Sequence, residues 1–220
     1  MLRPNVSAVH VLLTAIAGWV DAVGYLSLKG FFVSFMSGNT TVMGLYLGSN
    51  QMSGVANAAT LVACFIAGGF CGAFLLAATG RGDPLILATE GLLLVAALGV
   101  ASFHGVGLAF SSVLALSMGV QNVAAAAGPV SAGQTYVTGT LSKLGQEFGK
   151  LAAGTGSLPV LLGNLITWLA LLLGVVIGAI AHASAGSIAL LAPALILFVL
   201  AARLRRDVRR QKPVAARRLR

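Results

Sequence analysis

The chain is expected to be an all-helical protein that crosses a membrane several times, and three observations predict this fold class. Of its 220 residues, 58% are hydrophobic and only 9% are charged, whereas a soluble domain is about a quarter charged. Several stretches of roughly 20 residues carry almost no charge, which is the length that an α-helix needs to cross a bilayer. Two further apolar stretches are interrupted by small polar residues at corresponding positions.

The apolar stretches define the expected elements in chain order. Continuous runs predict membrane helices near 8–28, 56–80, 84–103, 107–127, 158–182 and 186–203. The segments 30–50 and 130–150 are apolar enough to enter a membrane but contain clusters of Gly, Ser and Thr. We therefore expect about six transmembrane helices plus two broken or re-entrant half-helix elements. Apolar length alone would also allow both broken segments to cross fully, which gives eight spans.

The basic residues predict the orientation. From Arg203 to Arg220 the chain holds nine Lys or Arg and one acidic residue, Asp207. Lys and Arg are enriched in cytoplasmic loops, and the six-span arrangement puts all of them except Lys29 on the side of this tail. We therefore expect cytoplasmic N- and C-termini and a basic cytoplasmic tail at 204–220. The tail could also contact anionic lipid, whereas nucleic-acid binding would need a folded module beside it.

Two copies of one unit are visible in the sequence. The stretches "SFMSGNTTVMGLYLG" (34–48) and "TYVTGTLSKLGQEFG" (135–149) align without a gap, and the same alignment pairs Gly18 with Gly119 and Asp21 with Asn122. We interpret 1–103 and 104–203 as two membrane repeats. In the six-span arrangement their first helices run in opposite directions, which is the inverted repeat found in many transporters.

The broken elements carry the chemistry of a candidate site. Ser37 and Thr138 are expected to be N-caps, because a hydroxyl can accept from the free N–H groups of a helix start. Gly38 and Gly139 permit unusual dihedral angles and close backbone approach. Two such helix starts near the bilayer midplane would aim backbone N–H groups at a polar or anionic solute. In the alternative interpretation these residues only repair a kink. The remaining candidate residues of the two breaks are Asn39, Thr40 and Thr140.

Polar side chains at membrane depth extend this candidate site. Asp21 lies inside the first predicted helix, and its repeat counterpart Asn122 stands beside Gln121. Glu90 lies inside the third predicted helix. Ionisable groups in a bilayer are costly and usually face a cavity or a partner. We consider Asp21 and Glu90 candidates for carrying a proton coupled to transport, and a purely structural hydrogen bond is an equal alternative for Glu90.

Motifs of other functional classes are not found in the sequence. There is no Gly-rich phosphate loop with its Lys, no zinc-protease histidine pair and no nucleophile elbow. We therefore expect neither an enzyme nor a bound cofactor or metal. The leading hypothesis is a small secondary transporter or permease, in contact with lipid and a small-molecule solute. A passive channel and a non-transporting scaffold or accessory subunit are the alternatives. The small size of the chain favours a homodimer.

The strings "GWVDAVGYLSLKGFFVSFMSGNTTVMG" and "SMGVQNVAAAAGPVSAGQTYVTGTLSKLG" resemble the YoaK-like family of uncharacterised bacterial integral membrane proteins. The resemblance covers nearly the whole chain, and its most specific parts are the Gly-x-x-Asp at 18–21 and the Ser-Gly-Asn at 37–39. The family usually has Thr at the position of Ser37, and it often has basic residues where this chain has Ala124–Ala127. The resemblance implies a protein of the bacterial plasma membrane and no established substrate.

Overall fold

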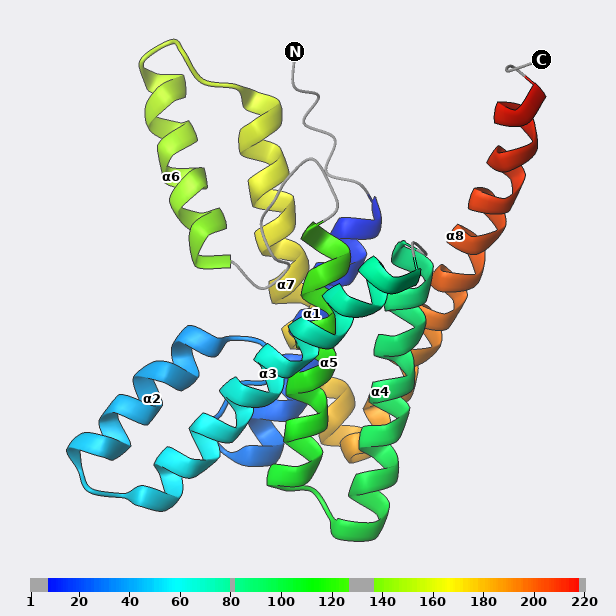
Figure 1. The fold of residues 1–220 in the computed structure, drawn as a ribbon. Coiled ribbons are helices and arrows are strands. Elements are labelled where there is room, and N and C mark those ends of the chain that lie inside the picture. The colour runs from blue at the N-terminus through cyan, green and yellow to red at the C-terminus, as the bar shows by residue number, and fades with distance from the viewer. Residues whose placement is uncertain (1–7, 80–81, 127–136, 218–220) are drawn as a thin grey trace.

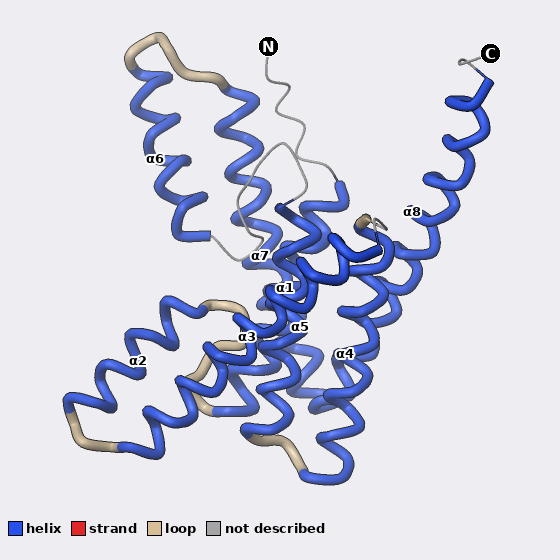
Figure 2. Tube along the Cα trace, in the orientation of Figure 1, coloured by secondary structure: helices blue, strands red, loops and turns tan. Residues whose placement is uncertain are grey.

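The computed structural model describes residues 8–79, 82–126 and 137–217, which form helices joined by short connections (Figures 1 and 2). The prediction of an all-helical membrane chain is therefore confirmed. Three single helices and the 49-residue stretch Leu158–Arg206 are long and apolar enough to cross a membrane, and Leu108–Ala124 is a shorter apolar helix. The elements are α1 (Ala8–Leu28), α2 (Met36–Gly48), α3 (Met52–Thr79), α4 (Asp83–His104), α5 (Leu108–Ala126), α6 (Val137–Ala152), α7 (Leu158–Ala185), the 3₁₀-helix η1 (Gly186–Leu190) and α8 (Leu191–Arg217).

The end of the last helix differs clearly from the prediction. The last helix does not end near 203 but continues to Arg217, so most of the predicted tail is helical. Its helix formers, mainly Ala, Leu and Arg, continue past the apolar run, and charge does not end a helix. The long apolar stretch from α7 to α8 is divided at η1, where Gly186 has a φ of +58° that other residues rarely adopt.

The two broken segments contain short helices rather than membrane-crossing ones. At 1.5 Å per residue, α2 is about 20 Å long and α6 about 24 Å long, whereas the hydrocarbon core of a bilayer is about 30 Å thick. Figure 1 shows both starting near the middle height of the molecule and running to opposite ends. At these ends the chain turns back, so that α2 packs on the following helix α3 and α6 packs on the following helix α7. Residues 130–136 of the second broken segment lie outside the described residues.

Four helices form two closely packed pairs, in which α1 contacts α7 and α3 contacts α5. In the first pair, a Cβ atom added to Gly18 would collide with the carbonyl oxygen of Leu171. In the second pair, a Cβ atom added to Gly119 would collide with that of Phe65. Small residues allow this close backbone approach in membrane helices. The two pairs use equivalent residues, because Gly18 aligns with Gly119 and, in the third helix of each unit, a shift of 106 residues pairs Phe65 with Leu171.

The remaining long helices complete the bundle. α4 packs against α5 on one side and against α8 on the other. Between them lies an apolar core whose largest fully buried side chains include Leu94, Phe110, Met118 and Leu197. Many side chains on the outer faces are large and apolar, for example Phe70 and Phe74 on α3. An outer surface of this kind suits contact with lipid rather than water.

Candidate functional site

The link between α1 and α2 is held by the side chain of Asp21. Residues 29–35 of this link are not helical. Asp21 Oδ1 accepts hydrogen bonds from the backbone N–H groups of Val33 at 2.8 Å and of Ser34 at 2.9 Å. One side-chain oxygen thus satisfies two backbone N–H groups that the non-helical link leaves without helix partners. Asp21 therefore fixes the link against the middle of α1.

Asn39 holds the same link from the side of α2. Its side chain is fully buried. Its Oδ1 accepts from the backbone N–H of Phe32 at 2.9 Å, and its Nδ2 donates to the carbonyl oxygen of Phe32 at 2.6 Å. Only Asn and Gln carry both a donor and an acceptor in one planar amide, which is what this paired contact requires. The consecutive residues 32–34 of the link are thus held by two polar side chains, Asp21 from α1 and Asn39 from α2.

The start of α2 differs from the sequence prediction. The residue at the N-cap position is Phe35, and no side chain caps the helix. The prediction that Ser37 is an N-cap is wrong, because the helix begins one residue earlier and leaves Ser37 exposed in its first turn. Thr40 is also exposed, and its hydroxyl donates to the carbonyl oxygen of Met36 at 2.9 Å.

Gly38 has a packing role at this helix start. A Cβ atom at Gly38 would collide with the ring of Phe35 and approach that of Phe32. Tyr25 and Phe32 have ring centroids 4.9 Å apart, and Phe32 and Phe35 have centroids 5.3 Å apart. The sequence analysis did not include these aromatic residues in the site. The signal was present in "GFFVSFMSG", where three Phe residues precede the Ser-Gly-Asn.

A cavity of about 250 Å³ lies beside Asp21. Its wall comes from α1, from Phe32 of the link and from α7. Asp21 is the one carboxyl group among the lining residues, and the aromatic rings of Tyr25 and Phe32 are also part of the wall. Small-molecule sites are typically apolar cavities with a few polar groups that fix orientation. The cavity has this character. Its other lining residues are Ala22, Leu26, Val175 and Ala179.

The candidate residues of the second half are not brought into contact with Asp21. Gln121 in α5 is fully buried, and its Nε2 donates to the carbonyl oxygen of Leu13 in α1 at 3.1 Å. Asn122 donates to the carbonyl oxygen of Met118, within its own helix. The described part of α2 and that of α6 share no contact. The residues Thr138, Gly139 and Thr140 lie in the first turn of α6, which packs on α7. The prediction that Thr138 is an N-cap is therefore wrong, because α6 already begins at Val137.

Glu90 is the second buried carboxyl group of the membrane helices. It is fully buried in α4, and neither of its oxygens has a hydrogen-bond partner among the described residues. The structural hydrogen bond considered from the sequence is therefore not found in this part of the chain. Glu90 and Gln121 each lie about 20 Å along their helices from the turn 105–107. Since α4 and α5 pack together, the two residues lie at a similar depth.

The fold and this site define a class: a helical membrane protein with a non-helical link fastened inside the bundle. The chain belongs to the family described as Protein of unknown function (DUF1275), whose model matches residues 9–203. The expectation of a YoaK-like membrane protein is thereby confirmed.

Two relatives carry names that refer to the membrane. The UPF0700 transmembrane protein RA0705 of Rhizobium meliloti is 32% identical over 197 residues, covering 89% of this chain and 84% of the relative. The UPF0700 transmembrane protein YoaK of Bacillus subtilis is 32% identical over 148 residues, covering 60% and 63%. No solved structure matches the chain.

Proposed function

We propose that the protein is a small secondary transporter that moves a small polar solute, bound beside Asp21 where α1, the 29–35 link and α7 meet. The observation that carries the proposal is the fastened, non-helical backbone inside a bundle of membrane helices. Non-helical backbone at membrane depth is tolerated where it is buried in protein or lines a watery cavity. Broken helices at this depth are a recurrent feature of solute sites in transporters.

The repeat supports the same proposal. α2 and α6 start near the middle height and run to opposite ends (Figure 1). The first helix of each unit packs on the third helix of the other unit through equivalent glycines. This is the arrangement expected for an inverted repeat, in which the two halves can rock against each other around a central site.

The orientation of the chain is part of the proposal. Figure 1 places the start of α1, the start of α4 and the end of α8 toward the same end of the molecule. Lys150, in the last turn of α6, belongs to this end as well, whereas Lys29 follows the opposite end of α1. The distribution of Lys and Arg favours a cytoplasmic location for the basic end. We place both termini in the cytoplasm and the protein in the bacterial plasma membrane.

The cavity wall suggests which polar solutes are preferred. An ionised Asp21 would repel an anion and would favour a solute with an N–H or O–H donor or a positive charge. The aromatic rings suit an apolar body on the same solute. The uncapped start of α2 is the place where an anionic solute would instead be favoured. Cationic and hydrogen-bond-donating solutes and anionic solutes should therefore both be screened.

The proposal is tested with purified protein in liposomes and a panel of amines, amino acids, nucleobases and small carboxylates. Solutes that bind the folded protein are first found by their stabilising effect, which is about 2.7 kcal/mol at a hundredfold excess over Kd. A transported solute should then show saturable uptake. Non-saturable flux would support a channel instead, and a folded protein that moves no member of the panel would support a scaffold.

Two conservative variants test proton coupling. Asp21→Asn keeps an oxygen that can accept from the link, and Glu90→Gln keeps the shape of the buried side chain. If a carboxyl group carries the coupled proton, its variant should bind solute but lose the response of uptake to a pH gradient. Uptake that responds to the gradient equally in the wild type and both variants would contradict this role for both residues.

A further inference from the structure

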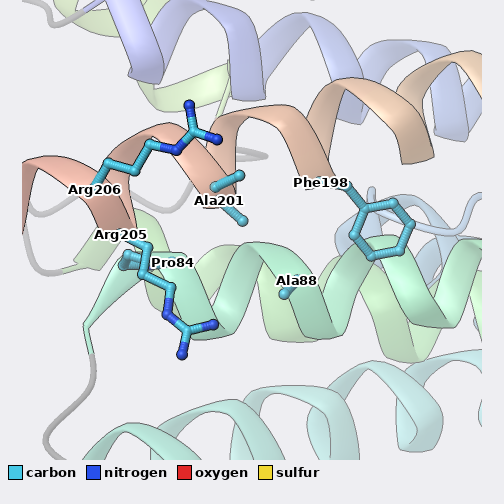
Figure 3. Close-up of a pocket in the computed structure, with 7 residues that line it drawn as sticks. Pro84, Ala88, Phe198, Ala201, Arg205 and Arg206 are labelled. Atoms are coloured by element: carbon cyan, nitrogen blue, oxygen red, sulfur yellow. The ribbon is translucent and has the colours of Figure 1, made fainter.

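We propose that the groove between α4 and α8 binds one anionic phospholipid, with its headgroup at Arg205 and Arg206 and part of an acyl chain along the helices. The inference is independent of the transport function proposed above. It starts from a cavity of about 410 Å³ that lies apart from Asp21, along the middle of α8, where the basic residues begin. The residues that line it are shown in Figure 3.

The cavity has one charged end and one apolar end. Arg205 and Arg206 are exposed and line its charged end. Figure 3 shows Arg205 extending beside Pro84 at the start of α4, whereas the guanidinium group of Arg206 extends to the other side of α8. Phe198 lies at the other end, seven residues earlier in α8, which is about 11 Å along the helix axis. Between the two ends the wall consists of the small residues Ala88, Ala201 and Ala202.

The apolar end of the groove is closed by a specific contact between the two helices. A Cβ atom at Gly91 in α4 would lie 3.1 Å from two atoms of the Phe198 ring, so the ring packs closely over this glycine. The groove therefore opens only between small side chains, where an acyl chain can lie against both helices. A free phosphate ion would use the arginines but would gain nothing from this apolar length.

The charge of the groove selects the headgroup. Guanidinium groups match the geometry of phosphate oxygens and can bind them in a bidentate way. The same end of α8 also carries Arg203. This surplus of positive charge favours a headgroup with a net negative charge and disfavours a choline headgroup, whose own positive charge would be repelled. Basic pockets between membrane helices on the cytoplasmic side bind anionic lipids for these reasons.

The test compares the retention of phosphatidylglycerol and phosphatidylcholine by the purified full-length protein, measured by native mass spectrometry. The wild type should retain phosphatidylglycerol in preference. Arg205→Ala/Arg206→Ala should weaken its binding by about 25-fold, since each basic residue at an anionic membrane surface contributes about fivefold. Arg203→Ala is the matched control, because Arg203 is exposed on the same helix but does not line the cavity. It should have a clearly smaller effect than Arg205→Ala or Arg206→Ala alone.

A variant without a change in charge distinguishes binding in the groove from general attraction of lipid to the basic tail. Ala202 is exposed and lines the cavity, so Ala202→Trp should obstruct the groove, reduce the retention of phosphatidylglycerol and leave the melting temperature in lipid-free detergent unchanged. Full retention in this variant, or an equal effect of Arg203→Ala and the single groove variants, would overturn the proposal. Displacement of the lipid by inorganic phosphate would also overturn it, in favour of a simple phosphate site.

Discussion

The fastening of the link by Asn39 can be tested by the variant Asn39→Ala. The change removes two hydrogen bonds and leaves the partly buried N–H and carbonyl groups of Phe32 without their partners. An unpaired buried polar group costs about 1–3 kcal/mol, so two of them should destabilise the closed link by about 4 kcal/mol. Because 1.36 kcal/mol corresponds to a factor of ten, opening of the link should become about a thousandfold more frequent.

The assay is hydrogen exchange of the backbone amides of residues 32–34, followed by mass spectrometry of the protein in detergent. These amides should exchange about three orders of magnitude faster in Asn39→Ala. Ser37→Ala is the control, because Ser37 lies in the same first turn of α2 but is exposed. Exchange in the two variants at the same rate would refute the conclusion that Asn39 holds the link. A small difference would indicate that water enters and replaces the lost partners.

Two further predictions concern packing and pH. Gly68→Val should destabilise the protein by at least about 2 kcal/mol, because a Cβ atom there would collide with a backbone carbonyl of α5. Gly44→Val should be tolerated, since nothing lies within 4 Å of that position; equal melting temperatures would contradict the packing argument. The Lys150 ammonium and the Ser157 N–H hydrogen-bond to Glu147 and lower the pKa of its carboxyl group below its usual 4.5. The hydrogen bond between Glu147 and the Ser157 N–H should therefore be complete at neutral pH and lost as the pH falls through this lowered pKa. Protection of the Ser157 amide from hydrogen exchange, corrected for the intrinsic exchange rate, should accordingly decrease in acid. A pH-dependent loss of the same size in Glu147→Gln would contradict this assignment.

The positions of the helices could be predicted because lipid imposes one simple requirement. A membrane helix needs a long stretch without charge, and the stretches near 8–28 and 84–103 match α1 and α4 closely. A break between α1 and α2 was also expected, but the Ser-Gly-Asn that suggested it lies inside α2, and the non-helical residues 29–35 precede it. The pairing of α1 with α7 was not visible. Lipid-facing and protein-facing sides of such helices are both apolar, so periodicity does not identify the partner.

Asp21 and Asn39 were singled out from the sequence, but their contacts depend on the folded link. Ser37 was expected to cap a helix because its hydroxyl suits that role. The structure instead uses Asp21, 12 residues before Val33, and Asn39, seven residues after Phe32. Such contacts form only after the chain has turned back on itself, so short-range capping rules do not anticipate them. The packing of Phe32 and Phe35 on Gly38 also forms only in the folded link, so it was not predicted from the sequence.

The first helix of each half packs on the third helix of the other half, and this arrangement has a consequence for biosynthesis. When the first four helices have left the ribosome, α1 and α3 still lack the neighbours that their glycines fit, because these are α5 and α7. The packing of α1 can be completed only after Leu171 and the neighbouring part of α7 have been inserted. Contacts between such distant parts of a chain form late and slowly. An amino-terminal half made alone would therefore expose two unsatisfied grooves, and it should be recovered only when the carboxy-terminal half is synthesised in the same cell.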